Sequence, residues 1–252
     1  MDQGEILRLE AVAALGWRAP DEHRVGGWVL RAASGFTGRA NSTLPLGPPD
    51  RPLPEAVDEV ERWYRARELR PCIVVPHALP WPEGDPLEDL LVARGWPLRD
   101  GPGIVMTAAS APVAALVPDA EVVITPEADD AWCAGYHYRG GPVHPMAASL
   151  LMSAPFQRFA AVPAGDGTVA AIGRVAVAEG WAGLTAMEVA PAHRRRGLAT
   201  AIIGALARVA VDEGATNFYI QVDETNTGGR ALYRRCGFTD RYRYHYRLAP
   251  EP

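Results

Sequence analysis

The sequence predicts a mixed α/β fold. Short apolar runs alternate along the chain with longer segments whose apolar residues recur at helical spacing, which indicates strands interleaved with helices. The order helix, strand, helix, strand occurs twice, in residues 55–109 and 198–249. The chain has 252 residues, of which 48% are hydrophobic, so it can form two compact domains of about 100–150 residues each.

The first half begins with an amphipathic helix pattern that is closed by Gly16. Glycines then separate two short strands, and a proline-rich turn precedes the next helix. The expected elements are a helix within 1–24, two strands within 26–47, a helix over 55–68, a strand over 72–75, a helix over 87–93 and a strand over 104–108. Arg31, Arg39, Asn41 and Ser42 are unusual polar residues in this setting, and they fit either a structural hairpin or part of an acceptor pocket.

Residues 109–120 are small and interrupted by prolines, which is the composition of a linker. We therefore place the domain boundary there and predict domains 1–112 and 113–252. The second domain is expected to contain strands over 121–125, 156–162, 169–177, 181–189, 218–222 and 242–248, with helices over 127–136, 146–153, 198–213 and 227–236.

The repeated order of elements suggests a degenerate duplication. Both copies end their second helix in a glycine followed by an aromatic residue, Gly95-Trp96 and Gly237-Phe238. Chance similarity within a mixed α/β chain is the alternative.

Charge and composition exclude several classes of protein. The net charge of −5 gives the whole molecule no basic footprint for nucleic acid or for an anionic membrane. No apolar run is long enough to span a membrane, and three widely spaced cysteines fit neither a disulfide framework nor a zinc site. We therefore expect a soluble cytoplasmic protein without a metal. We also expect either a monomer or a homodimer. All 25 basic residues are arginine, which a coding bias explains and which excludes a catalytic lysine.

The segment from Leu184 to Leu206 carries the main chemical signal. A buried strand leads through a proline-containing turn and three arginines to a glycine and an apolar helix. Gly197 allows close approach of a phosphate, and backbone N–H groups at a helix start bind anions. Arginines at this end oppose the helix dipole unless an anion is bound. The turn therefore predicts a phosphate site.

Downstream, residues 226–238 read Asn, four residues, Ala-Leu-Tyr, three residues, Gly-Phe. Together with the arginine turn, this segment resembles the GCN5-related N-acetyltransferases (GNATs), which transfer an acyl group from acyl-CoA to an amine. The resemblance covers residues 121–249 in order. It implies two tandem GNAT-like domains, of which the N-terminal one is degenerate and the C-terminal one is catalytic.

The resemblance also implies roles for individual residues. The backbone of Met187, Glu188 and Val189 would pair with the pantetheine arm of acetyl-CoA, and Asn226 would lie beside that arm. Tyr233 occupies the position of the tyrosine that protonates the departing thiolate. The pyrophosphate would be held by the residues of the turn and the first helical turn, which are Arg194, Arg195, Arg196, Gly197, Leu198, Ala199 and Thr200.

The general base is less clearly marked. Glu188 is the carboxylate nearest in sequence to the reaction site, but in a strand it faces away from Met187 and Val189, so a solvated or ion-paired role is an equal alternative. Gln221 stands where some relatives carry a carboxylate base and cannot act as one. His137 and His144 lie in a loop that lines the acceptor site in this family, as loop residues or as bases.

The N-terminal copy has Leu46-Gly47-Pro48-Pro49 in place of the arginine turn. Prolines lack the N–H donors that a phosphate needs, so this copy should not bind CoA. We therefore expect an acetyl-CoA-dependent N-acetyltransferase that moves an acetyl group directly to a primary amine of a small molecule or protein. A non-catalytic acyl-CoA-binding sensor or partner-binding module is the alternative.

Overall fold

A computed structural model describes residues 1–80, 84–117, 119–137, 144–165 and 167–251. The chain divides into two compact units. Unit 1 contains residues 1–105, 223–225 and 241–252, and unit 2 contains residues 106–222 and 226–240. The predicted boundary between residues 112 and 113 therefore lies inside unit 2, and the end of the chain belongs to unit 1.

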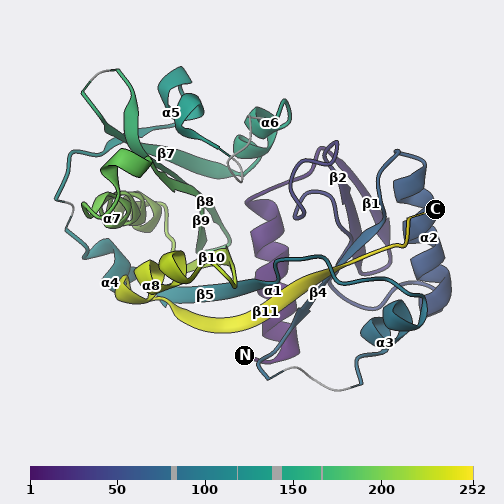
Figure 1. The fold of residues 1–252 in the computed structure, drawn as a ribbon. Coiled ribbons are helices and arrows are strands. Elements are labelled where there is room, and N and C mark those ends of the chain that lie inside the picture. Colours follow the sequence, from purple (N-terminus) through teal and green to yellow (C-terminus); the bar gives the residue numbers. More distant parts are fainter. Residues whose placement is uncertain (81–83, 118, 138–143, 166, 252) are drawn as a thin grey trace. The chain divides into compact units, whose positions relative to one another are not determined.

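The described part of unit 1 contains the helices α1, α2 and α3, a small antiparallel sheet and the strand pair β4 and β11 (Figure 1). Its elements are α1 (Gln3–Leu15), β1 (Asp21–Val25), β2 (Trp28–Ala32), β3 (Leu44–Pro45), α2 (Leu53–Arg65), β4 (Cys72–His77) and α3 (Pro86–Ala93), with parts of β5 (Gly103–Ala109) and β11 (Thr239–Leu248). β11 runs antiparallel to β4, from Arg243 opposite His77 to Leu248 opposite Cys72. This pairing explains why residues 241–252 belong to unit 1.

The core of unit 1 forms where helix α2 presents one face to β2 and β4. Trp28, Val60, Tyr64 and Trp96 are buried in one apolar cluster with neighbours from these elements. Removing such large apolar side chains from water supplies about 1.5–3 kcal/mol each, which orders the surrounding short strands.

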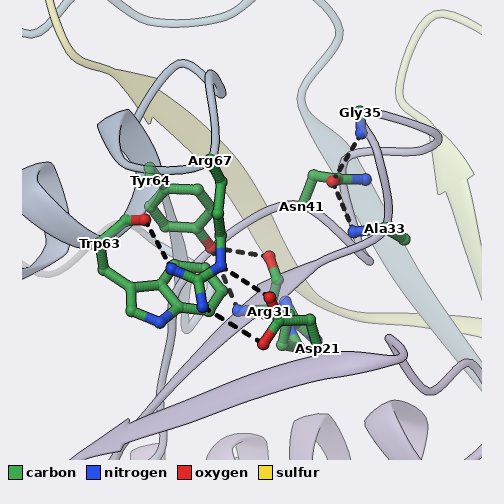
Figure 2. Close-up of polar contacts among 8 residues, drawn as sticks. All are labelled: Asp21, Arg31, Ala33, Gly35, Asn41, Trp63, Tyr64 and Arg67. Carbon is green, nitrogen blue, oxygen red and sulfur yellow. Dashed lines mark hydrogen bonds and ion pairs between the residues drawn. The ribbon is translucent and has the colours of Figure 1, made fainter.

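Arg31, Asn41 and Tyr64 of unit 1 hydrogen-bond to neighbouring residues of the same unit (Figure 2). The Tyr64 hydroxyl donates to the carbonyl of Arg31 at 2.9 Å, and the buried Arg31 side chain donates to the Ser42 carbonyl at 3.0 Å. Asn41 accepts from the N–H groups of Ala33 and Gly35 at 2.8 and 2.9 Å. Of the two readings of this polar set, these contacts support the structural one.

Unit 2 is a sheet with helices on both faces (Figure 1). Its elements are α4 (Ser110–Ala114), β6 (Val123–Thr125), α5 (Asp130–Gly135), α6 (Ala147–Leu151), β7 (Phe156–Pro163), β8 (Val169–Ala178), β9 (Trp181–Val189), the 3₁₀ turn η2 (Pro191–His193), α7 (Leu198–Asp212), β10 (Asn217–Asp223) and α8 (Thr227–Arg235). Strands β6 to β9 pair antiparallel in chain order, and β9 pairs parallel with β10. The fold is therefore mixed α/β, as predicted.

The two faces of this sheet are distinguished at β8. A Cβ on Gly173 would lie 2.5 Å from Ile202 of α7, whereas the neighbouring Ile172 packs towards Gly135 of α5. Adjacent strand residues face opposite sides, so α7 covers one face and α5 the other. The buried indole of Trp132 fixes α5 by donating to the carbonyls of Ala160 and Gly173 at 3.1 and 3.3 Å.

The segment expected to be a linker is structured in its first part. Residues 110–114 form α4, and the side chain of Arg208 on α7 donates to the carbonyl of Leu116 at 3.0 Å. The absence of a side chain at Gly204 lets Leu116 lie close to α7, because an added Cβ there would be 2.6 Å from the Leu116 carbonyl oxygen. A composition of alanine and proline, typical of linkers, is here used for close packing.

Candidate functional site

A gap opens in unit 2 where β9 and β10 stop pairing. Their parallel register runs from Trp181 opposite Asn217 to Leu184 opposite Ile220. β9 then continues to Val189, beyond this paired stretch. The end of β9 thus has an edge to which an extended amide-bearing ligand can add like a strand.

A β-bulge at Ala186 shapes this end of β9. Thr185 lies opposite Arg174 and Glu188 opposite Ile172, so two residues of β9 face the single residue Gly173 of β8. Ala186 has φ of 51°, a left-handed conformation that a non-glycine residue rarely adopts. The bulge bends the strand and explains why the pairing with β10 ends there.

The orientation of Val189 follows from its neighbour. The N–H of Ala190 donates to the Ala170 carbonyl of β8 at 3.0 Å. In an extended strand, successive N–H groups point to opposite edges, so the N–H of Val189 faces the β10 side. Arg194 reaches the Val189 carbonyl on that same side, with Nε at 3.3 Å. A donor for a developing oxyanion is therefore available where the strands diverge.

The predicted phosphate turn has the geometry of an anion site. Gly197 precedes α7 with φ of 77°, and a Cβ there would meet no atom of the described residues within 4 Å. No side chain in the described part of the chain caps α7, so the first N–H groups of this 15-residue helix are left for a ligand. Gly197 is required by its backbone conformation, while the space beside it stays open for a phosphate.

The three arginines of the turn are exposed and differ in their contacts. Arg194 binds the Val189 carbonyl, as described, and Arg196 lies 3.0 Å from Nδ1 of His193 through one guanidinium nitrogen. Arg195 has φ of 63°, which turns the chain sharply before Gly197. Together they concentrate positive charge beside the uncapped start of α7.

Helix α8 brings the second predicted motif to the same part of unit 2. Asn226 caps this helix by accepting from the N–H of Gly229 at 2.9 Å, which leaves its amide NH₂ as a donor. Tyr233 is the buried residue of α8, and its ring meets Phe238 edge-on with centroids 6.0 Å apart. Burial raises the pKa of the Tyr233 hydroxyl well above its usual value of 10, which keeps it a proton donor.

Cys236 links α8 to α7. Its thiol is in hydrogen-bond contact with the Thr200 side chain in the first turn of α7, and burial raises the pKa of the thiol. Tyr233 lies one helical turn earlier on the same helix. The contact places Tyr233 near the start of α7, while Cys236 itself is buried and protonated, which fits a role in packing.

Glu188 lies on the α5 face of the sheet, whereas Met187 packs towards α7. A Cβ at Gly173 would meet the Met187 sulfur at 2.7 Å beside Ile202, which fixes the α7 face for Met187. Oε2 of Glu188 accepts from the main-chain N–H of His137 at 2.9 Å. The predicted alternation is confirmed, and Glu188 is tied to the end of α5.

Sequence reasoning did not predict the pairing of His137 with Glu188. The ring Nδ1 of His137 lies 3.1 Å from Oε1 of Glu188, and both side chains line a cavity of about 240 Å³ beneath α5. The two residues are separated by 51 positions, and the residue types alone carry no signal for this contact. His144 instead accepts from the N–H of Met146 at 3.1 Å.

Within the described ranges, no helix combines the length and apolar character needed to cross a membrane. No set of three or more His, Cys, Asp or Glu side chains among the described residues is arranged to hold a metal ion.

Comparison with known proteins identifies relatives along the whole chain. Residues 3–247 match the family described as "Probable histone acetyltransferase Rv0428c C-terminal". The chain is 30% identical over 257 residues to the "Probable histone acetyltransferase Rv0428c" of Mycobacterium tuberculosis, covering 97% of this chain and 74% of that protein. It is 27% identical over 250 residues to the "Uncharacterized N-acetyltransferase YobR" of Bacillus subtilis, covering 97% and 98%.

Solved structures share the fold. A GCN5-related N-acetyltransferase from Kribbella flavida has a TM-score of 0.68 at 19% identity and covers 100% of this chain and 98% of its own. A tandem GNAT protein from the clavulanic acid biosynthesis pathway has a TM-score of 0.64 at 16% identity, covering 97% and 88%.

The fold, the diverging strands and the glycine turn before α7 define an acyltransferase of the GNAT superfamily, in agreement with these relatives. Within that superfamily, the chain belongs to the Rv0428c C-terminal family.

Proposed function

We propose that this acyltransferase uses acetyl-CoA and transfers the acetyl group directly to a primary amine. The observation that carries the proposal is the divergence of β9 from β10 beside the uncapped start of α7. A ligand with amides in one part and a pyrophosphate in another fits this arrangement, because the strand edge pairs with amides and the helix start binds anions.

In this proposal, different residues bind different parts of the co-substrate. The backbone of Met187 to Val189 pairs with pantetheine amides, and the amide NH₂ of Asn226 lies beside the same arm. The segment Arg194 to Thr200 holds the pyrophosphate with N–H groups and guanidinium groups. Arginine positions the phosphates, and the thioester supplies the activated acetyl carbon.

The chemistry needs three further contributions. An amine with a pKa near 10 must lose a proton before it attacks the thioester. In this proposal the Glu188 carboxylate promotes the loss of that proton. The N–H of Val189 stabilises the oxyanion that forms when the amine adds to the thioester carbonyl. Tyr233 donates its proton to the thiolate as the carbon–sulfur bond breaks, and recovers one from the nitrogen of the intermediate.

The test is to measure thiol release from acetyl-CoA with a panel of diamines, amino sugars, aromatic amines, amino acids and a basic peptide. The proposal expects at least one acceptor to give thiol and an acetylated product in equal amounts, with the product identified by mass spectrometry. Tight calorimetric binding of acetyl-CoA without thiol release from any acceptor would contradict it and favour the sensor. A histone peptide is included in the panel because one relative is named a probable histone acetyltransferase.

A further inference from the structure

The hydrogen bonds around His137 determine which ring nitrogen carries a proton. Nδ1 lies 3.2 Å from the Gly135 carbonyl and 3.1 Å from Oε1 of Glu188. Both neighbours are acceptors, so Nδ1 must be the donor. In the neutral imidazole, Nε2 then carries a lone pair and is free to accept a proton.

Glu188 is already engaged at both carboxylate oxygens. Oε1 accepts from Nδ1 of His137, and Oε2 accepts from the main-chain N–H of the same residue. A carboxylate held in this way orients the imidazole and compensates its charge after protonation, as in the acid–histidine pairs of other enzymes. The main-chain bond remains whatever side chain stands at position 137.

The cavity beside the pair gives an amine access to it. Its volume is about 240 Å³, and small or apolar side chains such as Ala131, Ala134 and Ile172 form its walls. Among the described residues that line it, His137 and Glu188 are the titratable ones. The His137 side chain is 52% exposed, so its ring is accessible to a substrate.

We propose that His137 is the general base of the acetyl transfer and that Glu188 acts through it as a positioning residue. The proposal rests on the proposed function. The acceptor ammonium gives one proton to Nε2 of His137, and the imidazolium later releases it to water. The neutral nitrogen then forms the carbon–nitrogen bond, the carbon–sulfur bond breaks, and the second nitrogen proton passes through Tyr233 to the thiolate.

The pH dependence of kcat/KM for the best acceptor of the panel tests this role. Wild-type activity should rise with pH as the imidazole loses its proton. His137→Gln should lower kcat/KM by about 10²–10³-fold and remove this rise, while the KM for acetyl-CoA stays unchanged. Glu188→Gln should keep the rise but lower kcat/KM by less than His137→Gln does, because the imidazole is still present and loses only the carboxylate that orients it. His23→Gln, at an exposed histidine of β1 in unit 1, is the matched control.

Two readouts separate a catalytic role from a structural one. Added imidazole should restore turnover to His137→Ala in proportion to its concentration, because the missing base can be supplied from solution. Nitrogen-15 NMR of His137 in the wild-type protein should show the Nδ1–H form, and an Nε2–H form would overturn the proposal independently of activity.

The outcomes also separate this proposal from the function on which it rests. If His137→Gln keeps the wild-type rate and pH dependence, the base assignment is overturned and the acetyltransferase stands. If the wild-type protein acetylates no amine, the proposed function is overturned and the base assignment fails with it.

Discussion

His245 on β11 donates a hydrogen bond from Nε2 to Oε2 of Glu88 on α3, across 3.0 Å in the buried part of unit 1. Arg247 donates to the other oxygen, with Nε at 3.1 Å. Burial opposes ionisation of Glu88, but the hydrogen bonds of Arg247 and His245 outweigh it and lower its pKa. Burial is also the main cause that lowers the pKa of His245 and of its neighbour His77.

We predict that this cluster makes unit 1 sensitive to acid. A lowered pKa means that the unfolded state binds more protons, so stability is lost as pH falls. The loss should begin as pH falls below about 6.5, where unfolded histidines become charged, and increase below about 4.5, where unfolded Glu88 is protonated. Urea unfolding followed by tryptophan fluorescence at pH 7.5, 6.0, 5.0 and 4.0 measures it. A stability that is constant over this range would contradict the assignment.

Glu88→Gln should destabilise unit 1 by about 3 kcal/mol at pH 7.5, because Arg247 keeps its charge in a buried place without its carboxylate. The matched control is Glu251→Gln, which breaks an exposed pair with Arg70 at 3.1 Å and should cost about 0.5 kcal/mol or less. Equal unfolding free energies for the two variants would show that the buried cluster is not stabilising.

Gly197 and Gly214 stand at opposite ends of α7 with φ of 77° and 86°, and at neither position would an added Cβ meet a described atom within 4 Å. Changing either to alanine should cost about 1 kcal/mol or more of stability through backbone strain. Gly197→Ala should in addition weaken acetyl-CoA binding at least tenfold, because the strain is relieved by moving the N–H groups of the turn. Calorimetric titration of both variants with acetyl-CoA measures the difference, and equal affinities would remove Gly197 from the site.

Tyr233→Phe should lower kcat by about 10²-fold and leave the KM for acetyl-CoA nearly unchanged, because the lost hydroxyl acts when the thiolate leaves. Tyr242→Phe is the matched control in unit 1. Its hydroxyl donates to Glu10 at 2.7 Å, so that variant should lose stability, by about 1 kcal/mol, rather than turnover. Steady-state kinetics and thermal unfolding on both variants decide the matter, and full activity of Tyr233→Phe would exclude the proton transfer.

The sequence was sufficient to predict elements whose burial repeats regularly. Helix α2 and strand β8 have long apolar patterns, and both were located within a few residues. β1 was not predicted, because four of its five residues are exposed and polar, and only Val25 is buried. An exposed strand of this kind lacks the alternation of apolar and polar residues from which a strand is predicted.

The turn before α7 was predictable from the run of three arginines and the glycine that follows it. In the structure Gly197 has a left-handed conformation directly before the helix. The bulge at Ala186 could not be predicted, because a non-glycine residue adopts the left-handed conformation there under tertiary constraint. The contact of His137 with Glu188 likewise depends on how α5 packs on the sheet, which no local pattern encodes.

The packing of residues 110–116 against α7 gives a final prediction, at Gly204. Alanine is normally the better helix residue by about 1 kcal/mol. At Gly204, however, a Cβ would lie 2.6 Å from the Leu116 carbonyl oxygen, so either this segment or α7 must shift. Overpacking of this kind typically costs about 1–3 kcal/mol, which outweighs the gain in propensity.

Gly204→Ala should therefore destabilise unit 2 by about 1 kcal/mol net, although it places the best helix former inside a helix. Gly228→Ala in α8 is the matched control, because its added Cβ has no neighbour within 4 Å among the residues that the structure describes, and only the favourable propensity remains. Chemical denaturation of both variants should give opposite signs. A stabilised Gly204→Ala protein would mean that residues 110–116 are not held against α7, and the segment would then be the flexible linker that its composition suggests.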